Sequence, residues 1–246
     1  SNTFSNFNSK YPIYADLHTH SISSGHGSED TITDMIRCAS ESGLSLFGIS
    51  DHGPATSSSA KPSYFQSLKL ADRDRFGIRV LYGAELNIIN TAGDVDLDDE
   101  ILSALDYAII SIHPPIFKPY HDKDLSSAYI RAMDHPKVRF LGHIDDARFP
   151  VDFEYLLEIA KEKHVYPEIN NGSLMPDAYR INGQENCRRI LSICKKLDLP
   201  VLLSSDSHGK KNIGNMQYIF PLLEELDFPA HLVLNSDLSV LSEIIQ

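Results

Sequence analysis

The stretch YADLHTHS, residues 14–21, sets the fold class of this chain and introduces its chemistry. Its first half has the character of a short strand, and its second half places His18 and His20 one residue apart, just after Asp16. Side chains at positions i and i+2 of a strand point to the same side, so both imidazoles can reach one metal ion. The H-x-H spacing alone is only moderately specific, so other segments must supply further ligands.

Apolar runs of strand length recur along the chain at a spacing that leaves room for helices between them. The predicted strands cover residues 13–18, 45–51, 79–88, 107–113, 139–144, 165–170 and 200–206. The predicted helices cover residues 30–42, 63–75, 124–134, 152–163, 183–197 and 215–226, with a weaker helix at 98–105. This alternation is typical of βα units around a parallel sheet, and it predicts one closed or nearly closed α/β barrel.

Length and composition also favour one domain, because 246 residues with 42% hydrophobic side chains can bury a sizeable core. Residues 1–10 are interpreted as the scar of a cleaved tag plus an N-terminal extension, and residues 11–246 as the domain. The net charge of −12 disfavours nucleic acid as a partner. No apolar run approaches the roughly 18 residues of a membrane span. We therefore expect a cytoplasmic protein without a membrane partner; its oligomeric state stays open.

Polar residues end every predicted strand. These ends read DLHTH, GISDHG, GAELN, ISIHPP, LGHIDD, PEINNGS and SSDSHG. The carboxyl ends of parallel barrel strands meet at one mouth, so their side chains are expected to lie together. The histidines of these ends and of the first loop are His18, His20, His26, His52, His113, His143 and His208. Imidazoles beside carboxylates are ligands for Zn²⁺, Fe²⁺ or Mn²⁺, so the pattern predicts a metal site at the rim.

The same segments resemble the polymerase and histidinol phosphatase (PHP) family, most closely its short stand-alone phosphatases of the YcdX type. The resemblance rests on YADLHTHS, FGISDHGP, GAELNI, HPPIFKPYHDK, GHIDD, EINNGS and LSSDSHG, which occur in the family's order. It implies a distorted (βα)7 TIM-like barrel with three divalent metal ions, usually zinc, at the C-terminal rim. Histidine and carboxylate ligands without thiolate also accept Mn²⁺ or Fe²⁺.

The ligands that the resemblance implies fall into three groups that share one carboxylate. The first group is His18, His20, Glu85 and Asp206; the second is Glu85, His113 and His143; the third is His26, His52 and His208. Glu85 would bridge the first two ions. Every ligand position of the family thus carries a metal-binding residue in this chain.

Close divalent ions suit phosphoester hydrolysis, because they activate water, polarise phosphoryl oxygens and neutralise the leaving alkoxide. We therefore expect a metal-dependent phosphatase for small phosphate monoesters, with a metal-bridging hydroxide as the nucleophile. The predicted catalytic residues are Glu85, Asp206 and His208. The candidates for binding substrate are His121, Lys123, Arg148 and Asn170, and His121 or Lys123 could also protonate the leaving group.

Several alternatives stay open. Within the family, the chain could be a histidinol-phosphate phosphatase or a non-catalytic PHP module. A nuclease would need a basic groove, of which the acidic composition gives no sign. Metal-dependent amidohydrolases also begin with H-x-H, but they normally use a bridging lysine where this chain has Glu85.

Overall fold

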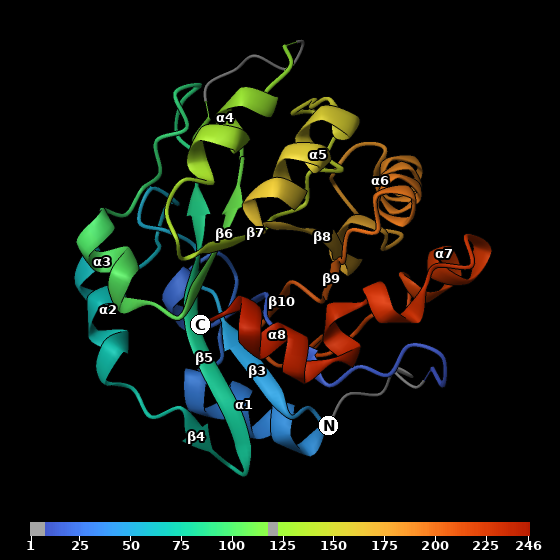
Figure 1. Ribbon diagram of the computed structural model, residues 1–246. Helices are drawn as coiled ribbons and strands as arrows, with labels where there is room; N and C mark the ends of the chain where they lie inside the picture. Colours follow the sequence, from blue (N-terminus) through green and yellow to red (C-terminus); the bar gives the residue numbers. More distant parts are fainter. Residues whose placement is uncertain (1–7, 118–122) are drawn as a thin grey trace.

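In a computed structural model that describes residues 8–117 and 123–246, parallel strands form a nearly closed barrel inside a ring of helices (Figure 1). In their order around the sheet, the barrel strands are β1 (Ala15–Asp16), β3 (Leu46–Ile49), β5 (Ile78–Asn87), β6 (Tyr107–Ser111), β7 (Val138–Leu141), β8 (Tyr166–Asn170) and β9 (Leu202–Ser204). Each strand pairs in parallel with the next one in this order. The architecture predicted from the sequence, a (βα)7 TIM-like barrel, is confirmed.

Helices alternate with the strands along the chain. They are α1 (Ile32–Glu41), α2 (Pro62–Ser67), α3 (Asp99–Ala104), α4 (Ser126–Ala132), α5 (Phe153–Lys163), α6 (Gly183–Leu197), α7 (Phe220–Glu225) and α8 (Leu238–Ile244). Whereas α1 to α7 surround the strands, α8 lies across one end of the barrel (Figure 1). Its Leu241 packs into the inner core of the barrel.

Two helices are shorter than the sequence pattern predicts. The predicted helix at 63–75 ends as α2 and a 3-10 turn, because the Arg73 guanidinium donates to the carbonyl oxygens of Leu68, Lys69 and Ala71 and caps that end. The strand β4 (Asp74–Arg75) follows and pairs antiparallel with β5. The predicted helix at 215–226 begins only at Phe220, where Pro221 occupies the first turn of α7, a position that proline favours.

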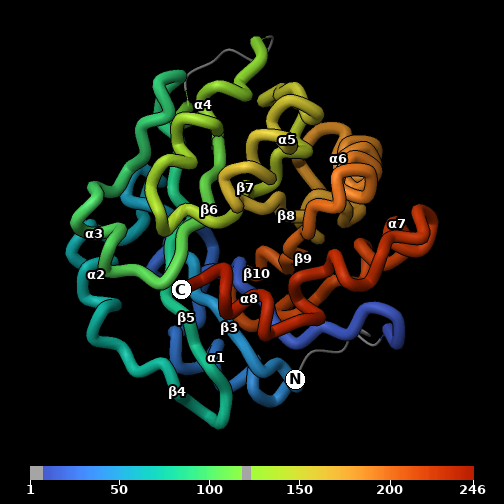
Figure 2. Tube along the Cα trace, viewed as in Figure 1, coloured from blue at the N-terminus to red at the C-terminus, as the bar shows by residue number. Residues whose placement is uncertain are grey.

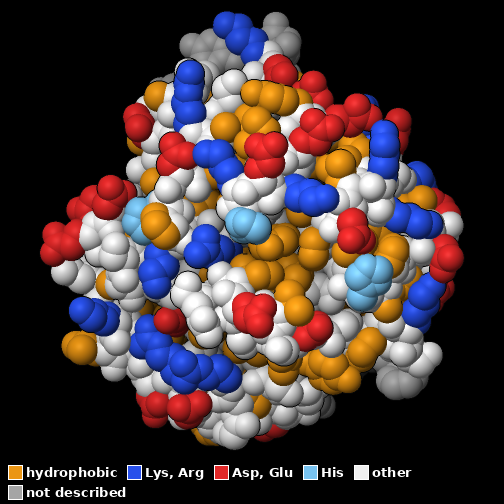
Figure 3. Space-filling model, viewed as in Figure 1, with side chains coloured by type: hydrophobic (Ala, Val, Ile, Leu, Met, Phe, Trp, Pro, Cys, Tyr) orange, Lys and Arg blue, Asp and Glu red, His pale blue; other side chains and the backbone are white. Residues whose placement is uncertain are grey.

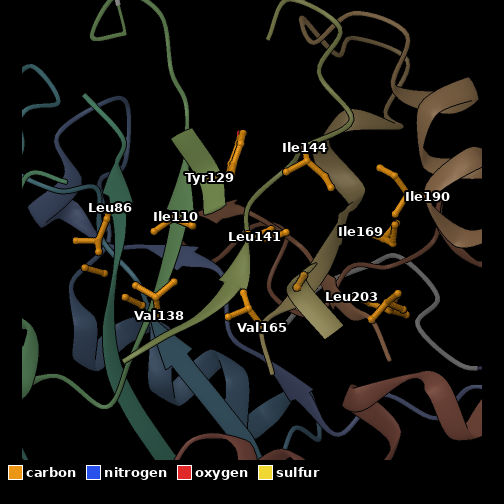
Figure 4. Close-up of a cluster of buried hydrophobic side chains, with 14 of the residues drawn as sticks. Leu86, Ile110, Tyr129, Val138, Leu141, Ile144, Val165, Ile169, Ile190 and Leu203 are labelled. Atoms are coloured by element: carbon orange, nitrogen blue, oxygen red, sulfur yellow. The ribbon is translucent and has the colours of Figure 1, made fainter. Parts of the chain in front are cut away.

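Side chains along the strands alternate between two cores. On β6, Tyr107 and Ile109 belong to the inner core of the barrel, whereas Ala108 and Ile110 pack outward against the helices. Figure 4 shows this outer layer, with Ile110, Leu141, Ile169 and Leu203 among its labelled side chains. The period of two explains why one strand can carry both core residues and, farther along its inner face, ligands.

Tyr107 closes the barrel beneath the rim. Its hydroxyl donates to the carbonyl oxygen of Leu17, and its ring fills space left by Gly48. A Cβ atom at Gly48 would lie 2.2 Å from the Tyr107 hydroxyl oxygen, so only glycine fits there. The polar rim therefore lies directly above the tightly packed apolar inner core of the barrel.

Asn235 joins the two ends of the sheet. Its Nδ2 donates to the carbonyl oxygens of Ala15 (2.9 Å) on β1 and Leu203 (2.7 Å) on β9, and its Oδ1 accepts from the Leu203 backbone N–H at 2.8 Å. At the rim, β2 (Thr19–His20) pairs with β10 (Ser207–His208), which brings His20 opposite His208. The barrel is thus held closed by a buried side chain at one level and by a short strand pair at another.

The first described residues also contact the segment that follows α7, outside the barrel (Figure 2). The Tyr11 hydroxyl donates to the carbonyl oxygen of Phe228 at 2.7 Å, and Lys10 pairs with Asp227 at 2.6 Å. Acidic, basic and apolar side chains are intermingled over the face that Figure 3 shows. Among the described residues, no helix has the length and apolarity needed to cross a membrane.

Candidate metal centre

Glu85 is the hub of the rim. It lies on the inner face of β5, is 1% exposed, and its carboxylate faces five histidines from four other segments. Its oxygens lie 3.0 to 3.3 Å from ring nitrogens of His18, His20, His52, His113 and His143. Burial alone would raise the pKa of this carboxyl, but the facing His18, His113 and His52 hold its pKa well below the usual range. Glu85 is therefore an anionic carboxylate that all these imidazoles share.

The first predicted ligand group is assembled in the structure. The ligand atoms of His18, His20, Glu85 and Asp206 all lie within 4.8 Å of one another. Asp206 Oδ1 lies 3.0 Å from His20 Nε2 and 3.3 Å from His18 Nε2. Asp206, the second residue after β9, adopts a φ of 55°, a left-handed conformation that aspartate tolerates better than most residues.

The atoms at this centre are oriented for a cation rather than for one another. Although they lie close together, several buried ligand atoms have no hydrogen-bond partner within the described part of the chain: His18 Nε2, His20 Nε2, His52 Nδ1, Asp206 Oδ1 and His208 Nε2. Buried polar atoms normally find partners, so a converging set without them fits a bound metal. Imidazole and carboxylate donors suit zinc, iron or manganese.

The second predicted group is also brought together. His143 Nε2 lies 3.2 Å from Glu85 Oε2 and 3.1 Å from His113 Nε2, and His113 Nε2 lies 3.3 Å from Glu85 Oε2. On the far side of its ring, His113 Nδ1 lies 2.8 Å from Asn87 Oδ1. That contact turns Nε2 of His113 toward the centre.

The third predicted group is looser. The structure gathers His52 and His208 with His20, whose ring stacks between theirs at centroid distances of 4.2 and 4.3 Å. The His26 ring lies 5.4 Å from that of His52 and 5.5 Å from that of His208, and His26 is exposed. His26 thus borders this group from an exposed loop.

Glu168 supports the centre from below and was not singled out from the sequence. Its carboxylate is fully buried on β8, hydrogen-bonds His18 Nδ1, and accepts from the His143 backbone N–H at 2.9 Å. A carboxylate on the outer nitrogen of a ligand histidine fixes the ring and its tautomer. Glu168 stands two residues before Asn170 on the same strand, so both side chains face inward. This spacing was the signal in the sequence that could have identified Glu168.

Asp51 anchors the loop after β2 and lies outside the ligand groups. It accepts from the hydroxyls of Ser21, Ser24 and Tyr64 at 2.6 to 2.8 Å. The Ser24 hydroxyl lies 3.0 Å from His20 Nδ1. Asp51 therefore orients His20 through Ser24.

The histidines at the rim titrate in opposite directions. For His20, burial alone would lower the pKa, but Asp206 and Glu85 raise it to about 9. For His208, burial and the neighbouring charge on His20 lower the pKa to about 4. The metal-free centre thus holds a proton on His20 and keeps His208 neutral at neutral pH.

A cavity of about 400 Å³ opens over the ligands. It is bordered by ligands from all three groups, and also by Arg148 and Arg180. The Arg180 side chain is 6% exposed, and its guanidinium donates to Asp206 Oδ2 at 2.8 Å. Arg180 was missed from the sequence, because the loop that carries it has no periodic pattern.

The substrate-binding residues predicted from the sequence occupy different places. Arg148 lines the cavity and pairs with Asp146 at 2.7 Å. Asn170 is buried and donates to the ligand Asp206 and to the supporting Glu168, so it positions these carboxylates and is not among the residues that line the cavity. Lys123 is exposed and is not among the described residues that line the cavity. His121 lies outside the described residues.

Comparisons with known proteins agree with this arrangement. A protein of Clostridium acetobutylicum named a probable phosphatase is 38% identical over 93% of this chain and 91% of its own length. A probable phosphatase of Acetivibrio thermocellus is 34% identical over 94% of each chain. The prediction of a phosphoester hydrolase agrees with both names.

A similar fold occurs in a crystal structure of histidinol phosphate phosphatase from Lactococcus lactis, in complex with zinc, L-histidinol and phosphate. It has a TM-score of 0.60 and 20% sequence identity, and the match covers 87% of this chain and 94% of that one. At this identity the likeness concerns the fold alone. The model of the PHP domain matches residues 16–172, which carry most of the ligands described above. The chain belongs to the PHP domain family.

Proposed function

We propose that this chain is a metal-dependent phosphatase that hydrolyses small phosphate monoesters with three divalent ions, zinc foremost, held by the ligand groups at the rim. The observation that carries this proposal is the single carboxylate of Glu85 facing five imidazoles at 3.0 to 3.3 Å. Such a shared carboxylate suits ions held close together. The names of the relatives and the zinc in the Lactococcus lactis structure support it.

The ligand groups divide the work at the rim. Bound divalent ions supply activated water and neutralise charge on phosphoryl oxygens. Glu85 is shared between the first two groups, and Asp206 completes the first. Arg180 adds a fixed positive charge at the edge of the cavity, oriented by Asp206 and by Ser173, whose Oγ lies 3.1 Å from Nη1. A phosphate dianion would therefore meet cationic partners on several sides.

Metal analysis is the first test. Protein purified with divalent metals present should hold about three ions per chain by elemental analysis, as a cluster of this donor set can bind. About one ion per chain would contradict the trinuclear proposal and favour a mononuclear hydrolase. No bound ion would favour a non-catalytic PHP module.

Activity is the second test. Metal-loaded protein should hydrolyse simple phosphate monoesters, and a chelator should abolish the reaction. Glu85→Gln removes the shared anionic charge and should lose metal and at least about a thousandfold in kcat/KM. Glu100→Gln, an exposed position on α3, is the matched control and should behave like the unmodified protein. Turnover in Glu85→Gln at the full rate would refute the assignment.

A further inference from the structure

We propose that this site selects phosphate monoesters whose leaving alcohol is apolar and uncharged, and that Tyr179 determines this specificity. The inference rests on the proposed phosphatase function and concerns the part of the substrate beyond the phosphate. It separates this chain from an enzyme for cationic amino-alcohol phosphates such as histidinol phosphate.

Two hollows at the rim reach different sets of ligands, and this difference indicates where the leaving group lies. The cavity of about 400 Å³ touches His52, His113 and His143 as well as Asp206 and His208. A second hollow of about 340 Å³ reaches only His26, Asp206 and His208 among the ligands. A phosphate placed over all three ligand groups therefore projects its ester substituent into the first cavity.

Apolar side chains make up a large part of the lining of this cavity. They are Ala55, Ile112, Pro114, Pro115, Ile116 and Tyr179. Apolar walls around a few polar groups are typical of sites that hold small molecules. Burying a methylene group there stabilises the complex by about 0.8 kcal/mol, whereas burying an ammonium without a counter-ion costs far more.

The charged residues that line the cavity are already paired. Asp146 is 4% exposed in its side chain and accepts from Arg148 Nε (3.1 Å) and Nη2 (2.7 Å), and from the backbone N–H of Ile181 at 3.3 Å. The other lining carboxylate, Asp206, accepts from Arg180 at 2.8 Å. Within the described lining, each carboxylate is thus paired with an arginine, so the subsite offers no unpaired carboxylate to the ammonium group of a substrate.

Tyr179 stands at the mouth with its ring available. It is 66% exposed, and its ring centroid lies 5.6 Å from the Arg148 guanidinium carbon and 5.5 Å from that of Arg180. Two flanking guanidiniums hold the ring by cation–π attraction, so little freedom is lost when a ligand packs on it. An exposed, held aromatic ring beside apolar walls favours an apolar leaving group.

Binding of non-hydrolysable phosphonates tests the subsite directly. Isothermal titration of the zinc-loaded protein should give a Kd for benzylphosphonate at least about tenfold lower than for 2-aminoethylphosphonate or 2-hydroxyethylphosphonate. Equal or tighter binding of 2-aminoethylphosphonate would overturn the proposed selectivity for uncharged leaving groups. Equal binding of 2-hydroxyethylphosphonate would overturn its apolar character.

Substitution identifies the residue. Tyr179→Ala should raise the Kd of benzylphosphonate about tenfold and leave that of 2-hydroxyethylphosphonate within about twofold, since only the ring contact is removed. Tyr155→Ala on α5, a tyrosine that is 48% exposed and lines neither cavity, should change neither value. An unchanged affinity of Tyr179→Ala for benzylphosphonate would refute the role of Tyr179.

Hydrolysis separates this inference from the proposed function. Benzyl phosphate should exceed O-phosphoethanolamine in kcat/KM by at least about tenfold, because the two alkyl esters differ mainly in the group that enters the cavity. If the protein hydrolyses both esters but prefers O-phosphoethanolamine, the inference on specificity is wrong and the phosphatase proposal stands. If the protein binds benzylphosphonate selectively but hydrolyses neither ester, the apolar subsite stands and the phosphatase proposal is wrong.

Discussion

Three inner histidines, His18, His20 and His113, are each oriented by a partner on the ring nitrogen that faces away from the centre. Glu168 holds His18, Ser24 lies 3.0 Å from His20 Nδ1, and Asn87 Oδ1 lies 2.8 Å from His113 Nδ1. With Nδ1 occupied, Nε2 is directed to the shared carboxylate of Glu85. The partners thus decide which nitrogen can bind metal.

Glu168 gives the sharpest test of this orientation. Glu168→Gln keeps the shape but weakens the acceptor for His18 Nδ1, so zinc affinity should fall about 10- to 100-fold. Competition with a chelating dye measures the affinity. The control is Glu158→Gln on α5, where the side chain is exposed. Equal zinc affinity in the Glu168 and Glu158 variants would show that the carboxylate charge has no part in orienting His18.

Metal uptake should depend on pH. In the metal-free protein the pKa of His20 is raised to about 9, so this imidazole carries a proton at neutral pH that metal must displace. Zinc affinity should therefore rise about tenfold per pH unit for each proton released, up to pH of about 9. Titration in buffers of different ionisation enthalpy counts the protons; a pH-independent Kd with no proton release would contradict the pairing of His20 with Asp206 and Glu85.

The same pairing affects the stability of the metal-free protein in a defined direction. Because the pKa of His20 in the folded state lies above its ordinary value of 6.5, the charged form stabilises the fold fully below pH 6.5. This contribution is lost as the pH rises through about 9. Zinc removes the dependence, since the metal-bound imidazole no longer titrates there.

At the residue scale, the sequence predicts ligands better than their supports. His18, Glu85 and His113 stand at strand ends, and strand ends are predictable from apolar runs. Glu168 contacts a histidine 150 residues away, a pairing that no local pattern contains. Arg180 lies in a loop whose path depends on tertiary contacts such as that with Asp206. These partners could be assigned only from coordinates.

At the scale of elements, the barrel closes between β1 and β9. At this seam a turn, and not direct strand pairing, joins the two strands. The 3-10 turn Leu234–Ser236 carries Asn235, whose amide bonds both strands. Val233 forms a parallel bridge with Val201 beside it. Asparagine suits this place because one side chain offers both a donor and an acceptor, as a strand's backbone does.

Replacing Asn235 should weaken the barrel as a whole. Asn235→Ala removes three buried hydrogen bonds and leaves backbone groups without partners, which should lower the free energy of unfolding by about 3 kcal/mol or more. Urea denaturation measures the change. Asn90→Ala, in an exposed loop, should stay within about 0.5 kcal/mol. A similarly small effect at Asn235 would show that the seam is held mainly by packing.

Element boundaries were predicted well where the apolar pattern is long and poorly where it is short. The strand predicted at 79–88 is β5 at Ile78–Asn87, and the helix predicted at 183–197 matches α6. Neither the strand β4 nor the helix α8 was predicted. Both are short, and α8 forms because Leu241 reaches the inner core, a contact that the sequence pattern does not express.

For the whole molecule, bound metal should add to the stability of the fold, because its ligands come from segments beside both the first and the last strand of the barrel. Zinc at about a hundred times its Kd should stabilise the native state by about 2.7 kcal/mol, a rise in Tm of roughly 5 to 10 °C at this chain length. Thermal unfolding with zinc and with a chelator measures it. Glu85→Gln should show a much smaller rise; an equal rise would place the stabilising ion elsewhere.

The pairing of β2 with β10 also bears on how the protein is made. His20 and His208, which face each other across that pair, are 188 positions apart in the chain. At synthesis rates of about 5 to 20 residues per second, roughly 10 to 40 s separate their appearance on the ribosome. During that interval the nascent chain carries an incomplete ligand set, because Asp206 and His208 have not yet been made. Faithful metal loading therefore belongs to the end of synthesis, when the last strand closes the barrel.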